Sequence, residues 1–220
     1  MLVDLSHTIE HGMITYKGLP APIISDHFTR KDSRRHYESG TEFQIGRIEM
    51  VANTGTYLDS PFHRYEDGRD VAQLELRSLA DLQGVVVRAQ DVSDRAITAK
   101  ALELLEVKSR AVLFHTGWDA YWRTQKYADG THPFLTADAA EYLADAGAAL
   151  VGIDSYNIDD TADGRRPAHS ILLAHGIPIV EHMCKLGGLP DSGFRFFAVP
   201  VKVKAFGTFP VRAFAIVSGD

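Results

Sequence analysis

Cysteine is almost absent from this chain of 220 residues, which contains only Cys184. A single thiol excludes an internal disulfide, and with it the class of small secreted domains that are stapled by disulfides. A nucleophilic cysteine needs a nearby base and a depressed pKa, and the sequence indicates neither. We therefore expect Cys184 to be a buried core thiol in a cytoplasmic protein.

Long apolar runs and an excess of positive charge are lacking too. No run approaches the ~20 apolar residues that a membrane helix needs, and the N-terminus lacks the basic and apolar regions of a signal peptide. Asp and Glu (29) outnumber Lys and Arg (23), and no basic run suggests binding to nucleic acid or an anionic membrane. We expect a cytoplasmic protein without a nucleic-acid or membrane partner.

No internal repeat, low-complexity segment or linker divides the sequence. The hydrophobic content of 45% is typical of a soluble globular protein, and 220 residues are enough to bury one core. We predict a single domain that spans residues 1–220.

The hydrophobic pattern predicts both strands and helices. Period-two alternation over residues 43–51 predicts a half-buried strand, and short apolar runs predict further strands over 84–89, 111–114, 150–153, 177–180, 195–203 and 212–217. Helices are predicted over 97–105, over 137–146 and from 167 to 175, after a long polar loop at 154–168. Because strands and helices alternate in the middle of the chain, the pattern favours an α/β or α+β fold with a mixed sheet.

The most informative segment runs from Asn53 to His63, with the sequence Asn-Thr-Gly-Thr-Tyr-Leu-Asp-Ser-Pro-Phe-His. It resembles the signature His-x-Gly-Thr-His-x-Asp-x-Pro-x-His of the metal-dependent cyclase/hydrolase family that includes kynurenine formamidase. Asn53 and Tyr57 stand where the family has histidines. The positions that match are Gly55, Thr56, Asp59, Pro61 and His63.

Other segments resemble the same family in the same order along nearly the whole chain. They are Asp4-Leu5-Ser6, His115-Thr116-Gly117-Trp118, Val151-Gly152-Ile153-Asp154, Pro167-Ala168-His169, Gly176 to Glu181 and Phe206 to Ala213. The resemblance implies a narrower fold class, an α/β domain of the swivelling β/β/α type with a mixed sheet. It also implies a small-molecule substrate and a homodimer or homotetramer.

By position, the resemblance assigns metal ligation to Asp59, His169 and Glu181. In the family another metal is held by the two signature histidines and shares the signature Asp. Asn53 and Tyr57 are poor substitutes for imidazole, since a phenol with an ordinary pKa near ~10 must first lose its proton. We expect at most one divalent ion, Zn or Mn, at the three remaining ligands. The alternative is a metal-free hydrogen-bond network of the same side chains.

The resemblance makes His63 the general acid/base, because imidazole exchanges protons near neutral pH. Ser60 and Pro61 fit an N-cap and a first helical position, which would bring His63 close to Asp59. Tyr57 is either a packing aromatic or a phenolic donor to the substrate oxygen, and Asn53 either donates to that oxygen or holds the adjacent turn.

His115 and Trp118 are candidates for lining the substrate pocket, although packing would explain both equally well. The hypothesis that follows is a hydrolase acting on a small amide, lactone or cyclic imide carbonyl, with catalytic residues His63, Asp59 and Tyr57. Two alternatives remain: a metal-free cyclase or dehydratase that uses His63 and Asp59, and a binding protein without catalysis.

Overall fold

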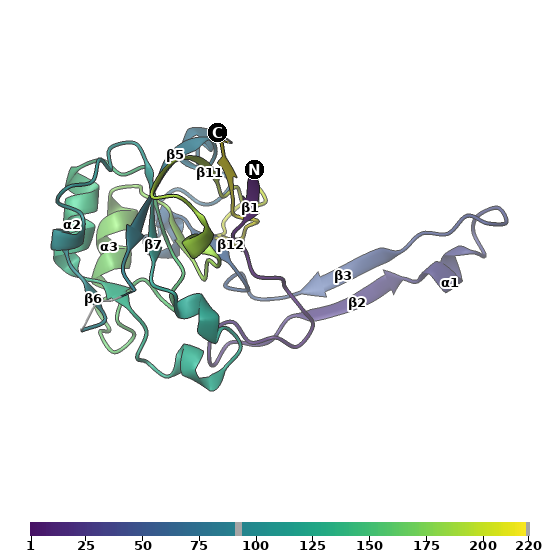
Figure 1. Cartoon of the computed structure of the whole chain (residues 1–220). Helices are drawn as coiled ribbons and strands as arrows, with labels where there is room; N and C mark the ends of the chain where they lie inside the picture. Colours follow the sequence, from purple (N-terminus) through teal and green to yellow (C-terminus); the bar gives the residue numbers. More distant parts are fainter. Residues whose placement is uncertain (91–93, 219–220) are drawn as a thin grey trace.

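The computed structural model describes residues 1–90 and 94–218, and its largest element is a curled mixed sheet of nine strands (Figure 1). The strand order is β1-β13-β11-β5-β7-β9-β10-β4-β12. Neighbours from β5 to β10 pair in parallel, and the strands on either side pair antiparallel. The predicted α/β class with a mixed sheet is confirmed. The strands are β1 (Leu2–Asp4), β4 (Tyr57–Asp59), β5 (Leu82–Arg88), β7 (Ala111–His115), β9 (Leu150–Ile153), β10 (Ile179–Glu181), β11 (Ser192–Phe197), β12 (Thr208–Pro210) and β13 (Phe214–Val217).

Two hydrophobic cores lie on opposite faces of this sheet. Helices α2 (Ala137–Asp145) and α3 (Pro167–Ala174) cover one face, where Val112 and Phe114 of β7 are buried. The residue between them, Leu113, belongs to the second core, which the curled sheet encloses with Phe194 and Phe196 of β11. Since successive side chains of a strand point to opposite faces, the near-continuous apolar run of β7 is explained by burial on both sides.

The helix predicted over residues 97–105 is wrong. The chain there forms the short strand β6 (Ala96–Ile97), which pairs with β8 (Phe134–Leu135), followed by one 3-10 turn. The backbone N–H of Ala99 donates to Asp138 Oδ2, and Leu104, within the predicted range, is 99% exposed. Tertiary pairing has overridden a local preference for helix. The 3-10 helices are η1 (Pro61–His63), η2 (Leu76–Ser78), η3 (Ala99–Ala101), η4 (Trp118–Tyr121), η5 (Gln125–Ala128) and η6 (Leu186–Gly188).

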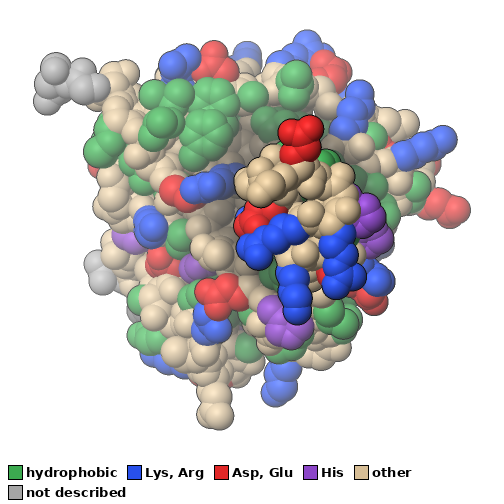
Figure 2. Space-filling model, turned by 90° about the vertical axis from the view of Figure 1, so that its right-hand side faces the viewer, with side chains coloured by type: hydrophobic (Ala, Val, Ile, Leu, Met, Phe, Trp, Pro, Cys, Tyr) green, Lys and Arg blue, Asp and Glu red, His purple; other side chains and the backbone are tan. Residues whose placement is uncertain are grey.

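An arm of residues 23–49 projects from the body of the molecule (Figure 1). It consists of β2 (Ile23–Phe28), α1 (Arg30–Ser33) and β3 (Ile45–Glu49), with β2 and β3 paired antiparallel. The alternating pattern correctly predicted a strand here, but every residue of β3 is exposed, so its predicted half-burial is wrong. In Figure 2, which faces the side from which the arm projects, Lys and Arg side chains gather in the foreground.

The pairing of β4 with its two neighbours brings distant parts of the chain together. Tyr57 lies opposite Glu181 of β10, and Asp59 lies opposite Thr208 of β12. Residues i and i+2 of a strand share a face, so Tyr57 and Asp59 are on the same side of the sheet, while Leu58 between them is buried in the second core. The face that carries Asp59 is also the face that α3 covers.

No helix in the described ranges combines the length and the apolar character needed to span a membrane.

Candidate active site

Asp59, His169 and Glu181, the predicted ligands, converge from β4, the first turn of α3 and the end of β10. His169 Nε2 lies 3.6 Å from Asp59 Oδ2 and 3.7 Å from Glu181 Oε1. Two ligands of a tetrahedral ion bound at ~2.1 Å are about 3.4 Å apart, so these separations suit a shared cation. Among the described residues, the set whose ligand atoms all lie within 4.8 Å of one another consists of Asp59, His63 and His169, and Glu181 is not part of it.

The donor atoms of this cluster are buried, and one of them is unpartnered. Asp59 is completely buried, and its Oδ2 has no hydrogen-bond partner among the described residues. An uncompensated buried carboxylate oxygen is costly, and a cation between Asp59 and His169 would satisfy it. The residues present therefore fit a divalent metal ion.

His169 is oriented by Asp159, a residue that the sequence did not single out. Nδ1 of His169 lies 2.6 Å from Asp159 Oδ2, so the ring donates its Nδ1–H to that carboxylate and leaves Nε2 toward Asp59. Asp159 is itself fixed by the backbone N–H groups of Ala168 and His169. A carboxylate behind a histidine is the arrangement that positions metal-binding imidazoles and raises their basicity.

The charges of the cluster shift its pKa values in different directions. Burial would lower the pKa of His169, but the charge of Glu181, hydrogen bonding to Asp159 and the nearby carboxylate of Asp59 raise it to about 10. Burial would raise the pKa of Asp59, yet the charges of His63 and His169 hold it below its usual value. Burial raises the pKa of Glu181, and the charge of Asp59 adds to this effect while that of His169 opposes it. A metal ion that binds Nε2 of His169 must therefore displace a proton.

His63 lies beside this cluster, as predicted, in η1 directly after Ser60 and Pro61. The Thr208 hydroxyl donates to Asp59 Oδ1 and lies 2.8 Å from His63 Nδ1. Because the only proton of the hydroxyl is already used, Nδ1 of His63 is the donor in this second bond. The neutral ring then carries its proton on Nδ1, and Nε2 is free to accept one.

Gly207, directly before β12, allows the chain to pass close to the backbone of His63. A Cβ atom at Gly207 would lie 2.5 Å from His63 Cα, far inside van der Waals contact, so no larger residue fits without moving the backbone. The N–H of Ser60 donates to the carbonyl of Gly207, which fixes the same contact.

Tyr57 and Asn53, at the two positions where the family signature has histidine, both face the cluster. The Tyr57 hydroxyl donates to Glu181 Oε2 at 2.7 Å. Burial and the charge of Glu181 raise the pKa of this phenol well above its ordinary value, so it is a poor metal ligand. Asn53 lines the same cavity as Tyr57. Glu181 Oε1 accepts from the backbone N–H of Ile158, so both of its oxygens are held in place.

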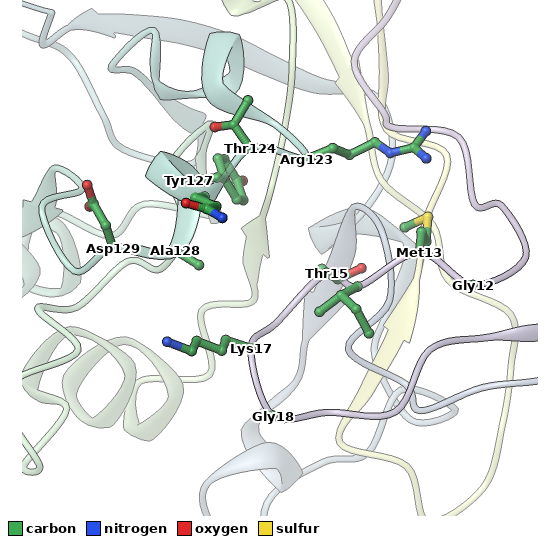
Figure 3. Close-up of a pocket in the computed structure, with 12 residues that line it drawn as sticks. Gly12, Met13, Thr15, Lys17, Gly18, Arg123, Thr124, Tyr127, Ala128 and Asp129 are labelled. Atoms are coloured by element: carbon green, nitrogen blue, oxygen red, sulfur yellow. The ribbon is translucent and has the colours of Figure 1, made fainter.

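A cavity of 310 Å³ opens onto these residues, a small volume for a ligand site. Its wall consists of Tyr16, Leu19, Asn53, Tyr57, His63, Arg64, Asn157, Arg166, His169 and Glu181. A larger cavity of 890 Å³ lies between residues 12–18 and 123–129 (Figure 3). Its lining includes Lys17, Arg123 and Asp129 but none of the predicted site residues, so the smaller cavity is the candidate active site.

His115 and Trp118 do not line the candidate active site. His115 lies 3.2 Å from an Arg88 guanidinium nitrogen on another side of the sheet, next to Gly187. The indole of Trp118 donates to the carbonyl of Tyr127 within a separate aromatic cluster. Cys184 is buried, as predicted, and burial raises the pKa of its thiol to about 11.

With this geometry established, comparison with known proteins gives a consistent result. Residues 3–160 match the model of the Cyclase family, described as "Putative cyclase". The chain belongs to the Cyclase family. It is 29% identical to the kynurenine formamidase of Bacillus cytotoxicus over 213 residues, which cover 96% of this chain and 95% of that protein.

Solved structures share the fold over the full length of the chain. One is isatin hydrolase A from Labrenzia aggregata bound to benzyl benzoate, with a TM-score of 0.83 and 21% identity, covering 100% of this chain and 94% of that one. Another is described as a potential metal-dependent hydrolase with cyclase activity. It has a TM-score of 0.80 and 26% identity, and the match covers 100% of this chain and 99% of that one. The resemblance inferred from residues 53–63 is thus confirmed at the level of family and fold.

Proposed function

We propose that this chain is a hydrolase that cleaves the C–N bond of a small amide, using one divalent metal ion held by Asp59, His169 and Glu181. Lactones and cyclic imides are the nearest alternative substrates. The observation that carries the proposal is the unpartnered Asp59 Oδ2, buried 3.6 Å from His169 Nε2. Relatives named as a formamidase and as hydrolases support the reaction class.

The reaction adds water across the C–N bond, so that a hydroxyl joins the carbonyl carbon and a proton joins the leaving nitrogen. A bound metal ion would polarise the carbonyl and lower the pKa of water. His63 Nε2 takes a proton from the attacking water and returns it to the leaving amine, while Thr208 and Asp59 keep the ring in the required tautomer. Asn53, on the cavity wall, is placed to donate a hydrogen bond to the carbonyl oxygen.

The direct test combines metal content with turnover. Protein purified without a histidine tag should contain about one divalent ion per chain by mass spectrometry of the elements. Chelation should abolish hydrolysis of formanilide, and added Zn or Mn should restore it. Full turnover by the stripped protein would overturn the role of the metal. A metal-loaded protein that cleaves no amide, imide or lactone would overturn hydrolysis itself and favour binding without catalysis.

We also propose that the chain forms a homodimer or homotetramer through the arm of residues 23–49. Large apolar side chains of the arm are exposed by 41% to 54%, namely Ile23, Ile24, Tyr37, Phe43, Ile45 and Ile48. An isolated two-stranded hairpin is at best marginally stable in water, and an exposed apolar patch of this kind is typical of an interaction surface. A second copy of the chain would bury it.

The arm proposal is tested by the mass of the protein in solution. By sedimentation equilibrium, the wild type should be an oligomer, and Ile48→Asp should raise the dissociation constant by about a hundredfold, because it places an unpaired charge in the interface. Leu104→Asp is the matched control, since Leu104 is equally apolar, 99% exposed and outside the arm. A monomeric wild type at micromolar concentration, or equal effects of the two substitutions, would contradict the proposal.

A further inference from the structure

Two arginines on the wall of the candidate active site differ from the other arginines of the body in their ion pairing. Of the 15 arginines, 11 have a carboxylate oxygen within 4.0 Å. Four have no such partner among the described residues. Arg30 and Arg35 belong to the projecting arm, and the other two, Arg64 and Arg166, both line the 310 Å³ cavity.

These two guanidinium groups are held by neutral partners. Arg64 Nε donates to the Ser170 hydroxyl at 3.2 Å, and Arg166 donates to the backbone carbonyl of Asp160 at 3.2 Å. The side chain of Tyr16 also lines the cavity. The contacts therefore position both side chains without neutralising their charge.

Both arginines are close in sequence to the histidines of the candidate active site. Arg64 directly follows His63, and Arg166 stands three residues before His169, as the N-cap residue of α3. Neither forms an ion pair within 4.0 Å with Asp59 or Glu181, so they do not serve as counter-ions for the carboxylates of the cluster. Their charge is available to a ligand in the cavity.

We propose that Arg64 and Arg166 bind a carboxylate of the substrate, so that the enzyme selects anionic amides over neutral ones. Arginine matches the geometry of a carboxylate and forms charge-assisted hydrogen bonds with it. Taking the ~30 Å³ that one water occupies as a unit, the cavity holds about ten non-hydrogen atoms. That is enough for a small amide that carries one carboxylate a few bonds from its carbonyl. The inference rests on the proposed function for the position of the scissile bond.

The test uses a matched pair of probes, 2-formamidobenzoate and formanilide, which share the scissile bond and differ in one carboxylate. The wild type should favour 2-formamidobenzoate, and Arg166→Gln or Arg64→Gln should each raise its KM by about ten- to a hundredfold, the worth of one charge-assisted hydrogen bond. In both variants the ratio of the KM values for the two probes should move toward one, and circular dichroism checks that they fold. Arg165→Gln is the control, because Arg165 is exposed, pairs with Asp163 and lies outside the cavity wall.

A calorimetric titration of the same probes into metal-stripped protein separates this inference from the proposed function. If the protein hydrolyses neither probe but binds 2-formamidobenzoate more tightly than formanilide, and loses that preference in Arg166→Gln, the carboxylate site stands and the hydrolase proposal does not. Equal affinity of the wild type for both probes would overturn the carboxylate site. So would a preference that survives Arg64→Gln and Arg166→Gln combined.

Discussion

Asp59→Asn is expected to remove the metal ion and to reduce amide hydrolysis by at least about a thousandfold, as the loss of a central catalytic group does. The substitution keeps the size of the side chain and an oxygen that can accept from the Thr208 hydroxyl. It removes the negative charge beside His169, and an amide oxygen is a far weaker ligand than a carboxylate for these ions. Metal content and formanilide turnover, measured on the same preparation, check the prediction.

The control for Asp59→Asn is Asp160→Asn. Asp160 is only partly buried, pairs with Arg95 at 3.5 Å and does not line the candidate active site. The substitution Asp160→Asn should leave metal content and turnover unchanged. A fully active, metal-loaded Asp59→Asn protein would contradict the assignment of Asp59 to the metal, and the function would then have to rest on His63 alone.

How much of the site could be predicted depended on whether its residues are close in sequence. Asp59 and His63 lie in one short segment, so the resemblance at residues 53–63 gave both. The assignment of His169 and Glu181 as ligands depended on further segments of the chain that resemble the family in the same order. Their approach to Asp59 depends on the pairing of β4 with β10, which no local pattern encodes.

The residues that the sequence missed act through contacts across the fold. Asp159 lies in a polar loop ten residues before His169, whose imidazole it orients. The Thr208 hydroxyl donates to Asp59, although 149 residues separate the two in sequence. Neither Asp159 nor Thr208 belongs to a sequence motif that would indicate its hydrogen-bond partner. Arg64 and Arg166 could have been noticed beside His63 and His169, but only the structure shows that neither has an ion-pair partner among the described residues.

The errors in the predicted fold have a similar origin. Period-two alternation over residues 43–51 indicates a strand but not what covers it, and in this chain β3 lies in the projecting arm (Figure 1). The apolar spacing at residues 97–105 favoured a helix, whereas the bond from Ala99 to Asp138 and the pairing of β6 with β8 stabilise another structure. Local propensity is a weak guide where such tertiary contacts exist.

His63→Gln is expected to lower turnover by about a hundred- to ten-thousandfold, the usual worth of a general acid/base, while the metal ion is retained. Glutamine keeps a polar group near Thr208 but cannot accept and return a proton. The prediction thus separates two roles, because His63 also lies within ligand distance of Asp59 and His169. Loss of the metal together with turnover would make His63 a ligand instead of the acid/base.

Thr208→Val tests the orientation of His63 separately from its presence. The substitution removes the hydroxyl that joins Asp59 to His63 Nδ1 but leaves every proposed ligand in place. The imidazole then loses the acceptor that fixes its tautomer, and turnover should fall by about tenfold, less than in His63→Gln, with full metal content. His175→Gln is the control, because His175 is exposed at the end of α3 and absent from the cavity wall. An unchanged rate in Thr208→Val would mean that His63 acts without the orienting bond, and the proton pathway would have to begin elsewhere.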